Sequence, residues 1–171
     1  PDTRADNNSA PSAIDLATAY ADLTVTTLTV PPTAKSGDNV LITWEVRNNG
    51  NATTDLGAWN DRIVLSADRN LSADDIVLAG SVTHTGVVAP GQSYLGQATL
   101  ALPRDLSGDF HVIVDVNANR TVTETTHTGN NAAASAGQIS VSLTPTANLT
   151  VSDVAGPSVL RPGDNATLPY T

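Results

Sequence analysis

Residues 40–51 give the first indication of the fold class; they read Val40-Leu41-Ile42-Thr43-Trp44-Glu45-Val46-Arg47 and then Asn48-Asn49-Gly50-Asn51. Apolar residues occupy every second position from Val40 to Val46, which is the period of a half-buried β-strand. The Asn and Gly residues that follow are typical of a turn. The stretch therefore predicts a strand with an apolar inner face, and Trp44 is its expected core anchor.

Similar alternation continues on both sides of this strand. Upstream, residues 23–30 predict a first strand that kinks or bulges near Thr26 and ends at Pro31-Pro32. Downstream, the same pattern predicts strands around residues 59–65, 76–82, 94–102, 110–116 and 139–143. Seven or eight short antiparallel strands in about 126 residues predict an all-β chain with an Ig-like β-sandwich fold.

The side chains that alternate onto the inner faces define the expected core. These are Ile42, Trp44, Ile63, Leu65, Leu100, Val112 and Val114. Truncating Trp44 should therefore cost the domain much of its stability.

An internal repeat sets the expected domain boundaries. Residues 21–25 recur as residues 147–151, and residues 37–39 recur as residues 163–165, both at an offset of 126. Residues 7–13 resemble residues 130–136 at an offset of 123. These matches predict the closing strand of a preceding repeat at 1–20, a complete domain at 21–146, and the opening strands of a following, truncated repeat at 147–171.

The two end segments expose apolar side chains and unpaired strand edges if they stand alone. We therefore expect them to pair with neighbouring chains or to lie along an edge strand of the central domain. In the parent protein their natural partners are the neighbouring repeats of the same chain.

Composition excludes several classes of partner. The chain has 8 Lys and Arg against 17 Asp and Glu, a net charge of -9, which disfavours nucleic acid and anionic membrane surfaces. It has no Cys, so a disulfide and a thiolate nucleophile are both ruled out. No apolar stretch is long enough to insert directly into a membrane, and residues 1–10 lack a signal-peptide pattern. We expect a mature internal fragment of a longer protein.

Several motifs resemble the CARDB family, the cell adhesion related domain found in bacteria. The resemblance covers about residues 21–143 and rests on the order and spacing of residues 21–25, 42–50, 59–66, 83–91, 122–124 and 130–131. It implies an Ig-like sandwich that occurs in tandem in large secreted and cell-surface proteins, adhesins among them, and it implies no catalytic residues. Where such domains often carry a second acidic residue before the Asn pair, this chain has Thr126-His127-Thr128-Gly129, which weakens an ion site at that hairpin.

The first candidate metal site is the polar loop of residues 68–75. Asp68, Asn70, Asp74 and Asp75 place oxygen atoms at spacings that could wrap a Ca²⁺ ion. The loop lacks the turn glycine and the acidic twelfth residue of an EF-type loop, and Arg69 adds an opposing charge. Ordinary turn hydrogen bonds by Asp and Asn are the alternative.

The second candidate metal site is the hairpin that contains Asp115 and Asn117, with Glu124 and the pair Asn130-Asn131 nearby in the sequence. Asn side chains also tie down long loops by bonding to backbone groups, which is the alternative here. No other cofactor is expected.

Catalysis and sugar binding find little support in the residues present. The three His residues are separated in the sequence, and each has an ordinary structural interpretation, so no catalytic residue is expected. Aromatic residues make up 4% of the chain, and Trp59 is the one plausible platform for a sugar ring.

These observations predict a non-catalytic tandem module that acts as a spacer, stalk or adhesion unit of a large secreted or cell-surface bacterial protein. Its adhesion partner would be a surface glycan or protein. The alternative is a carbohydrate- or calcium-binding accessory module of a secreted enzyme, and a small hydrolase domain is a third, weaker interpretation.

Overall fold

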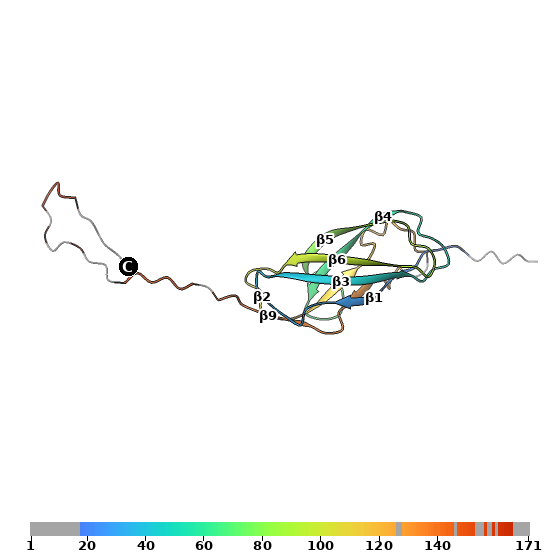
Figure 1. Ribbon diagram of the computed structural model, residues 1–171, viewed down its shortest axis with the longest axis horizontal. Coiled ribbons are helices and arrows are strands. Elements are labelled where there is room, and N and C mark those ends of the chain that lie inside the picture. Colours follow the sequence, from blue (N-terminus) through green and yellow to red (C-terminus); the bar gives the residue numbers. More distant parts are fainter. Residues whose placement is uncertain are drawn as a thin grey trace, which may run out of the picture.

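The computed structural model describes residues 18–125, 128–145, 147–152, 156, 159 and 161–165. Its described residues form nine strands and no helix (Figure 1). The strands are β1 (Leu23–Thr29), β2 (Thr33–Lys35), β3 (Asn39–Asn48), β4 (Ala58–Ser66), β5 (Ile76–Thr85), β6 (Ser93–Ala101), β7 (Gly108–Asp115), β8 (Ala132–Ala134) and β9 (Ile139–Ser142). Within these ranges no helix has the length and apolar character needed to cross a membrane.

The strands form two sheets that pack as a sandwich. The smaller sheet has the order β1-β3-β6, and the larger has the order β2-β9-β7-β4-β5, with β8 paired to β7. The predicted all-β sandwich is confirmed. Strands β5 and β6 are the edge strands on the same side of the sandwich, so a seam between the two sheets opens there (Figure 1).

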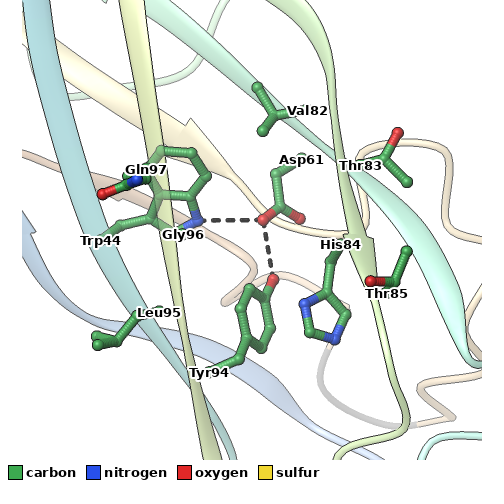
Figure 2. A pocket seen from close by; sticks show the side chains of 10 residues that line it. All are labelled: Trp44, Asp61, Val82, Thr83, His84, Thr85, Tyr94, Leu95, Gly96 and Gln97. Atoms are coloured by element: carbon green, nitrogen blue, oxygen red, sulfur yellow. Dashed lines mark hydrogen bonds between the residues drawn. The ribbon is translucent and has the colours of Figure 1, made fainter.

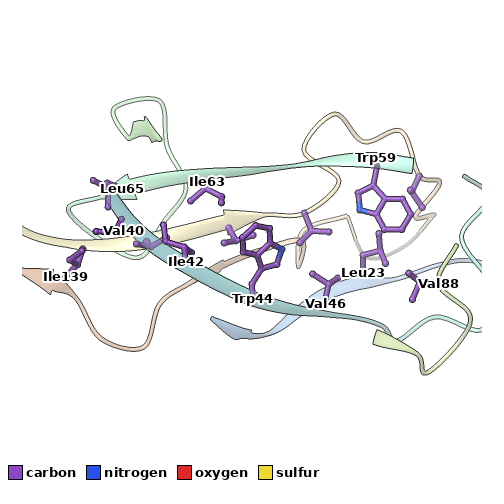
Figure 3. Packing of buried hydrophobic residues seen from close by; sticks show 14 of the residues in the cluster. Leu23, Val40, Ile42, Trp44, Val46, Trp59, Ile63, Leu65, Val88 and Ile139 are labelled. Atoms are coloured by element: carbon purple, nitrogen blue, oxygen red, sulfur yellow. The ribbon is translucent and has the colours of Figure 1, made fainter. Parts of the chain in front are cut away.

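Strand β3 organises the smaller sheet, as its alternation predicted. Its inner side chains Val40, Ile42, Trp44 and Val46 are buried, while it pairs antiparallel with β1 on one side and β6 on the other. Figure 3 shows these side chains packed against those of β4 across the sandwich. Six of the seven predicted core residues are fully buried, and Leu100 is partly buried at the margin of the cluster.

The predicted irregularity in the first strand is a bulge at Thr26. Val25 pairs with Val46 and Thr27 pairs with Glu45, so Thr26 has no partner in the register. The extra residue turns the strand by one position, and both Leu23 and Leu28 thereby contact the same core. The bulge thus keeps the apolar side chains on both sides of Thr26 directed toward the core.

Two short strands were not predicted, and one pairing differs from the expected antiparallel arrangement. β2 and β8 have three residues each, too few to show a period. β2 pairs with β9 in parallel. The reason is that the chain crosses to the larger sheet at Pro31-Pro32 without reversing, so β2 keeps the direction of β1.

The chain is held firmly where it approaches β1. The amides of Asn51 and Ala52 both donate to the carbonyl oxygen of Tyr20, at 3.0 Å. A Cβ atom on Gly50 would lie 2.3 Å from the same oxygen, so only glycine allows this close approach. The Asn-Gly turn after β3 therefore serves as a clamp on the incoming chain.

The segment after β9 repeats one local feature of the domain. In the turn of residues 35–38, the amide of Lys35 donates to Asp38 Oδ2 at 2.9 Å, and Gly37 has φ +82°. In the turn of residues 161–164, the amide of Arg161 donates to Asp164 Oδ2 at 2.8 Å, and Gly163 has φ +96°. The two turns are 126 residues apart and share the same hydrogen bonds, in agreement with the register of the sequence repeat.

The domain boundaries remain a prediction. The closing strand expected at 1–20 falls almost wholly on residues 1–17, which lie outside the described residues, as do Thr146 and most of the last residues of the chain. In the trailing segment Leu149 is 91% exposed, whereas its counterpart Leu23 is fully buried.

Candidate functional site

The open seam between β5 and β6 contains a hollow of about 430 Å³ (Figure 2). Residues 82–85 of β5 form one wall and residues 94–97 of β6 form the other. Trp44 of β3 and Asp61 of β4 lie at its inner end. The hollow thus brings together residues from both sheets that are far apart in the sequence.

Asp61 is the centre of a buried hydrogen-bond network. Its Oδ2 accepts from the indole Nε1 of Trp44 at 3.1 Å and from the hydroxyl of Tyr94 at 2.8 Å (Figure 2). Its Oδ1 accepts from the backbone amide of Asn117 at 3.2 Å. Because Asp61 is 1% exposed, these donors replace the water that a carboxylate normally keeps.

Three rings close one end of the seam. His84 lies between Trp59 and Tyr94, with ring centroids 4.2 and 3.8 Å away. Trp59 Nε1 donates to the Tyr94 hydroxyl at 3.3 Å, which links the ring stack to Asp61. His84 Nε2 lies 3.0 Å from the carbonyl oxygen of Gly86, and since a carbonyl only accepts, Nε2 carries the proton.

Burial changes the pKa values of Asp61, Tyr94 and His84. It raises the pKa of Asp61, against the opposing effect of the hydrogen bonds from Tyr94 and Trp44. Burial, and then the negative charge of Asp61, raises the pKa of Tyr94 far above its ordinary value. Burial lowers the pKa of His84. Tyr94 therefore stays a proton donor, and His84 is neutral near pH 7.

The sequence-predicted loop of residues 68–75 uses its oxygen atoms within its own turns. Asp68 Oδ1 accepts from the amide of Asn70 at 2.6 Å. Asp75 Oδ2 accepts from the amide of Ser72 at 2.8 Å, and Asp74 Oδ1 accepts from the Ser72 hydroxyl at 2.5 Å. These are the Asx-type contacts of the alternative interpretation.

The second predicted site is held by arginine and by amide groups. Arg62 and Arg120 each bind one carboxylate oxygen of Asp115 at 2.9 Å. Asn117, at φ 50°, accepts from the amides of Thr121 and Val122 through Oδ1. Its Nδ2 donates to the carbonyl of Val122 at 3.0 Å, so it ties down its own loop.

Glu124 joins that loop to β1. Its Oε1 accepts from the amide of Leu23 at 2.6 Å, and its Oε2 accepts from the side-chain amides of Asn117 and Asn131. Asn130 Nδ2 donates to Asp22 Oδ1 at 2.8 Å. The residues of this hairpin thus bond to one another and to the first strand.

Among the described residues, no three His, Asp or Glu side chains gather in a way that could hold a metal ion. The Ca²⁺ sites at Asp68, Asn70, Asp74 and Asp75 and at Asp115 and Asn117 remain predictions. The hollow at Asp61 was not anticipated. One signal for it exists in the sequence: on the inner face of β4, Asp61 follows Trp59 and precedes Ile63 and Leu65, so a carboxylate stands in an otherwise apolar row.

A family model described as CARDB matches residues 20–135. No curated protein matches the chain. A crystal structure of the CARDB domain of a Pyrococcus furiosus protein, in complex with di-metal ions, aligns with TM-score 0.52 and 17% identity over 75% of this chain and 99% of that one.

Two further structures align with the chain. A solution NMR structure of the same Pyrococcus furiosus domain aligns with TM-score 0.52 and 18% identity, over 74% of this chain and 100% of that one. The sporulation control protein of Bacillus subtilis aligns with TM-score 0.45 and 16% identity, over 73% of this chain and 50% of that one. At these identities the two CARDB structures support the fold alone.

Proposed function

The chain belongs to the CARDB family of non-catalytic, bacterial adhesion-related domains, and from this premise we propose that it is a spacer or stalk unit of a large secreted or cell-surface protein. The neighbouring repeats of the same chain are its constant partners. A surface glycan or protein is the partner of the whole assembly.

One observation carries this proposal: the chain enters the domain at one end and leaves it at the other (Figure 1). The incoming chain is bound at Tyr20 by the loop that follows β3. The outgoing chain is bound at Thr144 by Ser36, in the turn that precedes β3. The ten residues of β3 separate the two points by roughly 33 Å at the usual rise of a strand.

Such a unit adds its length to a string of like units. If the chain entered and left at the same end, each unit would hang from the string and add bulk instead of reach. The repeat at an offset of 126 fits the same arrangement, since every unit would hand the chain on to the next.

Small-angle X-ray scattering of two consecutive repeats of the parent protein tests this proposal. We expect the maximum dimension of the pair to approach twice that of a single unit. A pair no longer than one unit would contradict the stalk role. The full sequence of the parent provides an independent check, because a stalk predicts many similar repeats with a secretion signal, and an adjoining catalytic domain would favour an accessory module.

The calcium-binding alternative is favoured by one observation, the di-metal complex of the Pyrococcus furiosus CARDB domain. The described residues of this chain do not gather a comparable set of acidic or His ligands. Thermal melting with EDTA separates the two roles, since binding at 100 times the dissociation constant would add about 2.7 kcal/mol. A melting temperature that falls with EDTA and recovers with Ca²⁺ but not Mg²⁺ would establish the alternative.

Variants then assign such a site. Replacing Asp68 and Asp74 by Asn should abolish the Ca²⁺-dependent shift if it arises in that loop. If the shift survives, the hairpin at Asp115 and Asn117 is the better candidate. On the stalk proposal alone, we expect EDTA to leave the melting temperature unchanged.

A further inference from the structure

The carboxylate of Asp61 is buried without a cation beside it. In the part of the chain that the structure describes, both salt bridges are made by Asp115, and no Lys or Arg is paired with Asp61. Hydrogen bonds offset part of the cost of burying a charge. In its ionised form the carboxylate is a local source of negative potential at the inner end of the hollow.

Its two oxygens are not equally engaged. Oδ2 accepts two hydrogen bonds, from the Trp44 indole and the Tyr94 hydroxyl. Oδ1 accepts one, from the amide of Asn117 at 3.2 Å. A carboxylate offers about four acceptor positions, so Oδ1 keeps capacity for one more donor.

The walls of the hollow suit a cation on a short carbon chain. The rings of Trp44 and Tyr94 line the hollow, and aromatic rings attract a positive charge. Val82 and His84 alternate toward the interior on the opposite wall, whereas the side chains of Thr83, Thr85 and Gln97 are exposed and point away from Asp61 (Figure 2). A net charge of -9 on the whole chain adds a longer-range attraction for cations at low salt.

The unequal oxygens also select between the two common organic cations. A guanidinium group gains most from binding both oxygens of a carboxylate with its planar fork. An ammonium group is a compact point charge that is satisfied by one oxygen and by acceptors around it. With Oδ2 already occupied, the geometry favours the ammonium group.

We propose that the hollow between β5 and β6 binds a primary ammonium group on a short alkyl chain, through Asp61. The ligand is a free alkylamine or the side chain of a lysine on another protein. This inference does not rest on the stalk role, and either can fail while the other stands.

The primary experiment is an NMR titration of the ¹⁵N-labelled chain at low ionic strength and near-neutral pH. The probes are butylammonium, butylguanidinium and the uncharged butanol. We expect saturable shifts of the amides at residues 82–85 and 94–97 with butylammonium, weaker binding of butylguanidinium, and no saturation with butanol. Equal binding of butanol and butylammonium would overturn the proposal.

A second pair of probes distinguishes the sources of the ammonium group. One is a blocked glycine-lysine-glycine peptide, and the other carries norleucine in place of lysine. Tighter binding of the lysine peptide than of butylammonium assigns the site to a protein side chain. Binding of butylammonium without the lysine peptide assigns it to a free amine, and binding of the norleucine peptide as tight as that of the lysine peptide contradicts the proposal.

Variants test the role of the carboxylate. Asp61→Asn should weaken butylammonium binding by about tenfold or more. Asp109→Asn removes the same charge from an exposed position of β7, outside the lining of the hollow, and is the matched control. Equal weakening by both variants would mean that net charge alone attracts the amine, and would overturn the proposal.

Exposed Gln97 provides a test that leaves the Asp61 network intact if Asp61→Asn does not fold. Gln97→Lys adds a positive charge beside the hollow and should weaken binding severalfold, whereas Gln97→Glu adds a negative charge and should strengthen it. Identical affinities of the two Gln97 variants for butylammonium would place the ligand elsewhere.

Discussion

At the scale of single residues, Trp44 connects the core to the hollow. Its indole is 2% exposed, and its Nε1 donates to Asp61. Across the strand pair, a Cβ atom on Gly96 would lie 2.2 Å from the indole carbon Cε2, so β6 must carry glycine at this position to make room for the ring. The Trp44 indole thus fits only because residue 96 has no side chain.

Trp44→Ala should lower the free energy of unfolding by about 3 to 5 kcal/mol, because it leaves a cavity and removes a donor from a buried carboxylate. Urea unfolding of wild type and variant measures the loss. A loss below about 1 kcal/mol would contradict the central position of Trp44 in the core.

His84 should make stability depend on pH. Burial lowers its pKa from the ordinary value of 6.5, so below that pH the unfolded chain binds a proton that the folded chain does not. The free energy of unfolding should therefore fall as the pH drops from about 7.5 to 5. Asp61 on β4 and Tyr94 on β6 face this ring, and the raised pKa of Asp61 acts in the opposite sense, because the folded chain holds that proton to higher pH.

Urea unfolding across this pH range tests the prediction. His84→Gln should flatten the decrease relative to wild type. His111→Gln, which removes a histidine outside the ring stack, is the matched control. An equal slope for wild type and His84→Gln would show that another group governs the pH dependence.

At the scale of elements, the parallel pair of β2 and β9 lies between the two points where the chain is held. Both strands run toward the end where the chain leaves. A pull applied at Tyr20 and Thr144 moves them in opposite directions along their length, so their hydrogen bonds are loaded together. Ser36 extends the pair, since its amide donates to Ser142 at 2.8 Å and its hydroxyl oxygen accepts from the Thr144 amide at 2.9 Å.

Ser36→Ala should lower the force needed to unfold the domain when it is pulled by its ends. The variant removes the acceptor of the Thr144 amide, worth about 1 kcal/mol at equilibrium. Single-molecule force spectroscopy measures the effect, and Ser93→Ala, on the exposed β6 edge, makes the same chemical change outside the loaded pair. Equal unfolding forces for the two variants would contradict a mechanical role of Ser36 in this pair.

The elements also show what the sequence could predict. Long alternating strands and the bulge at Thr26 were visible because they depend on neighbouring residues. β2 and β8 were not, because three residues carry no period and their pairing depends on distant strands. The hollow required Asp61, His84 and Tyr94 to meet across three strands, and only the polar residue in the apolar row of β4 indicated it.

At the scale of the whole molecule, the described residues of the trailing segment carry exposed apolar side chains. Leu149, Val151 and Val159 are 91%, 70% and 78% exposed. Their counterparts in a complete repeat would lie on the first strands. Such exposed apolar side chains favour contacts with other chains.

Light scattering of residues 1–171 beside a chain trimmed to 21–146 tests this. We expect association that increases with concentration for the longer chain, and a monomer for the trimmed one. If both stay monomeric while amide exchange shows protected ends, the end segments fold back onto their own domain.

The opposite positions of Tyr20 and Thr144 have a further consequence for a string under tension. About 120 residues lie between them, and an extended chain of that length spans roughly 400 Å. A unit that opens therefore releases more than ten times the roughly 33 Å that separate its attachment points when it is folded. Each unit is in this sense a reserve of slack, which lengthens the string before any covalent bond is strained and is taken up again when the domain refolds.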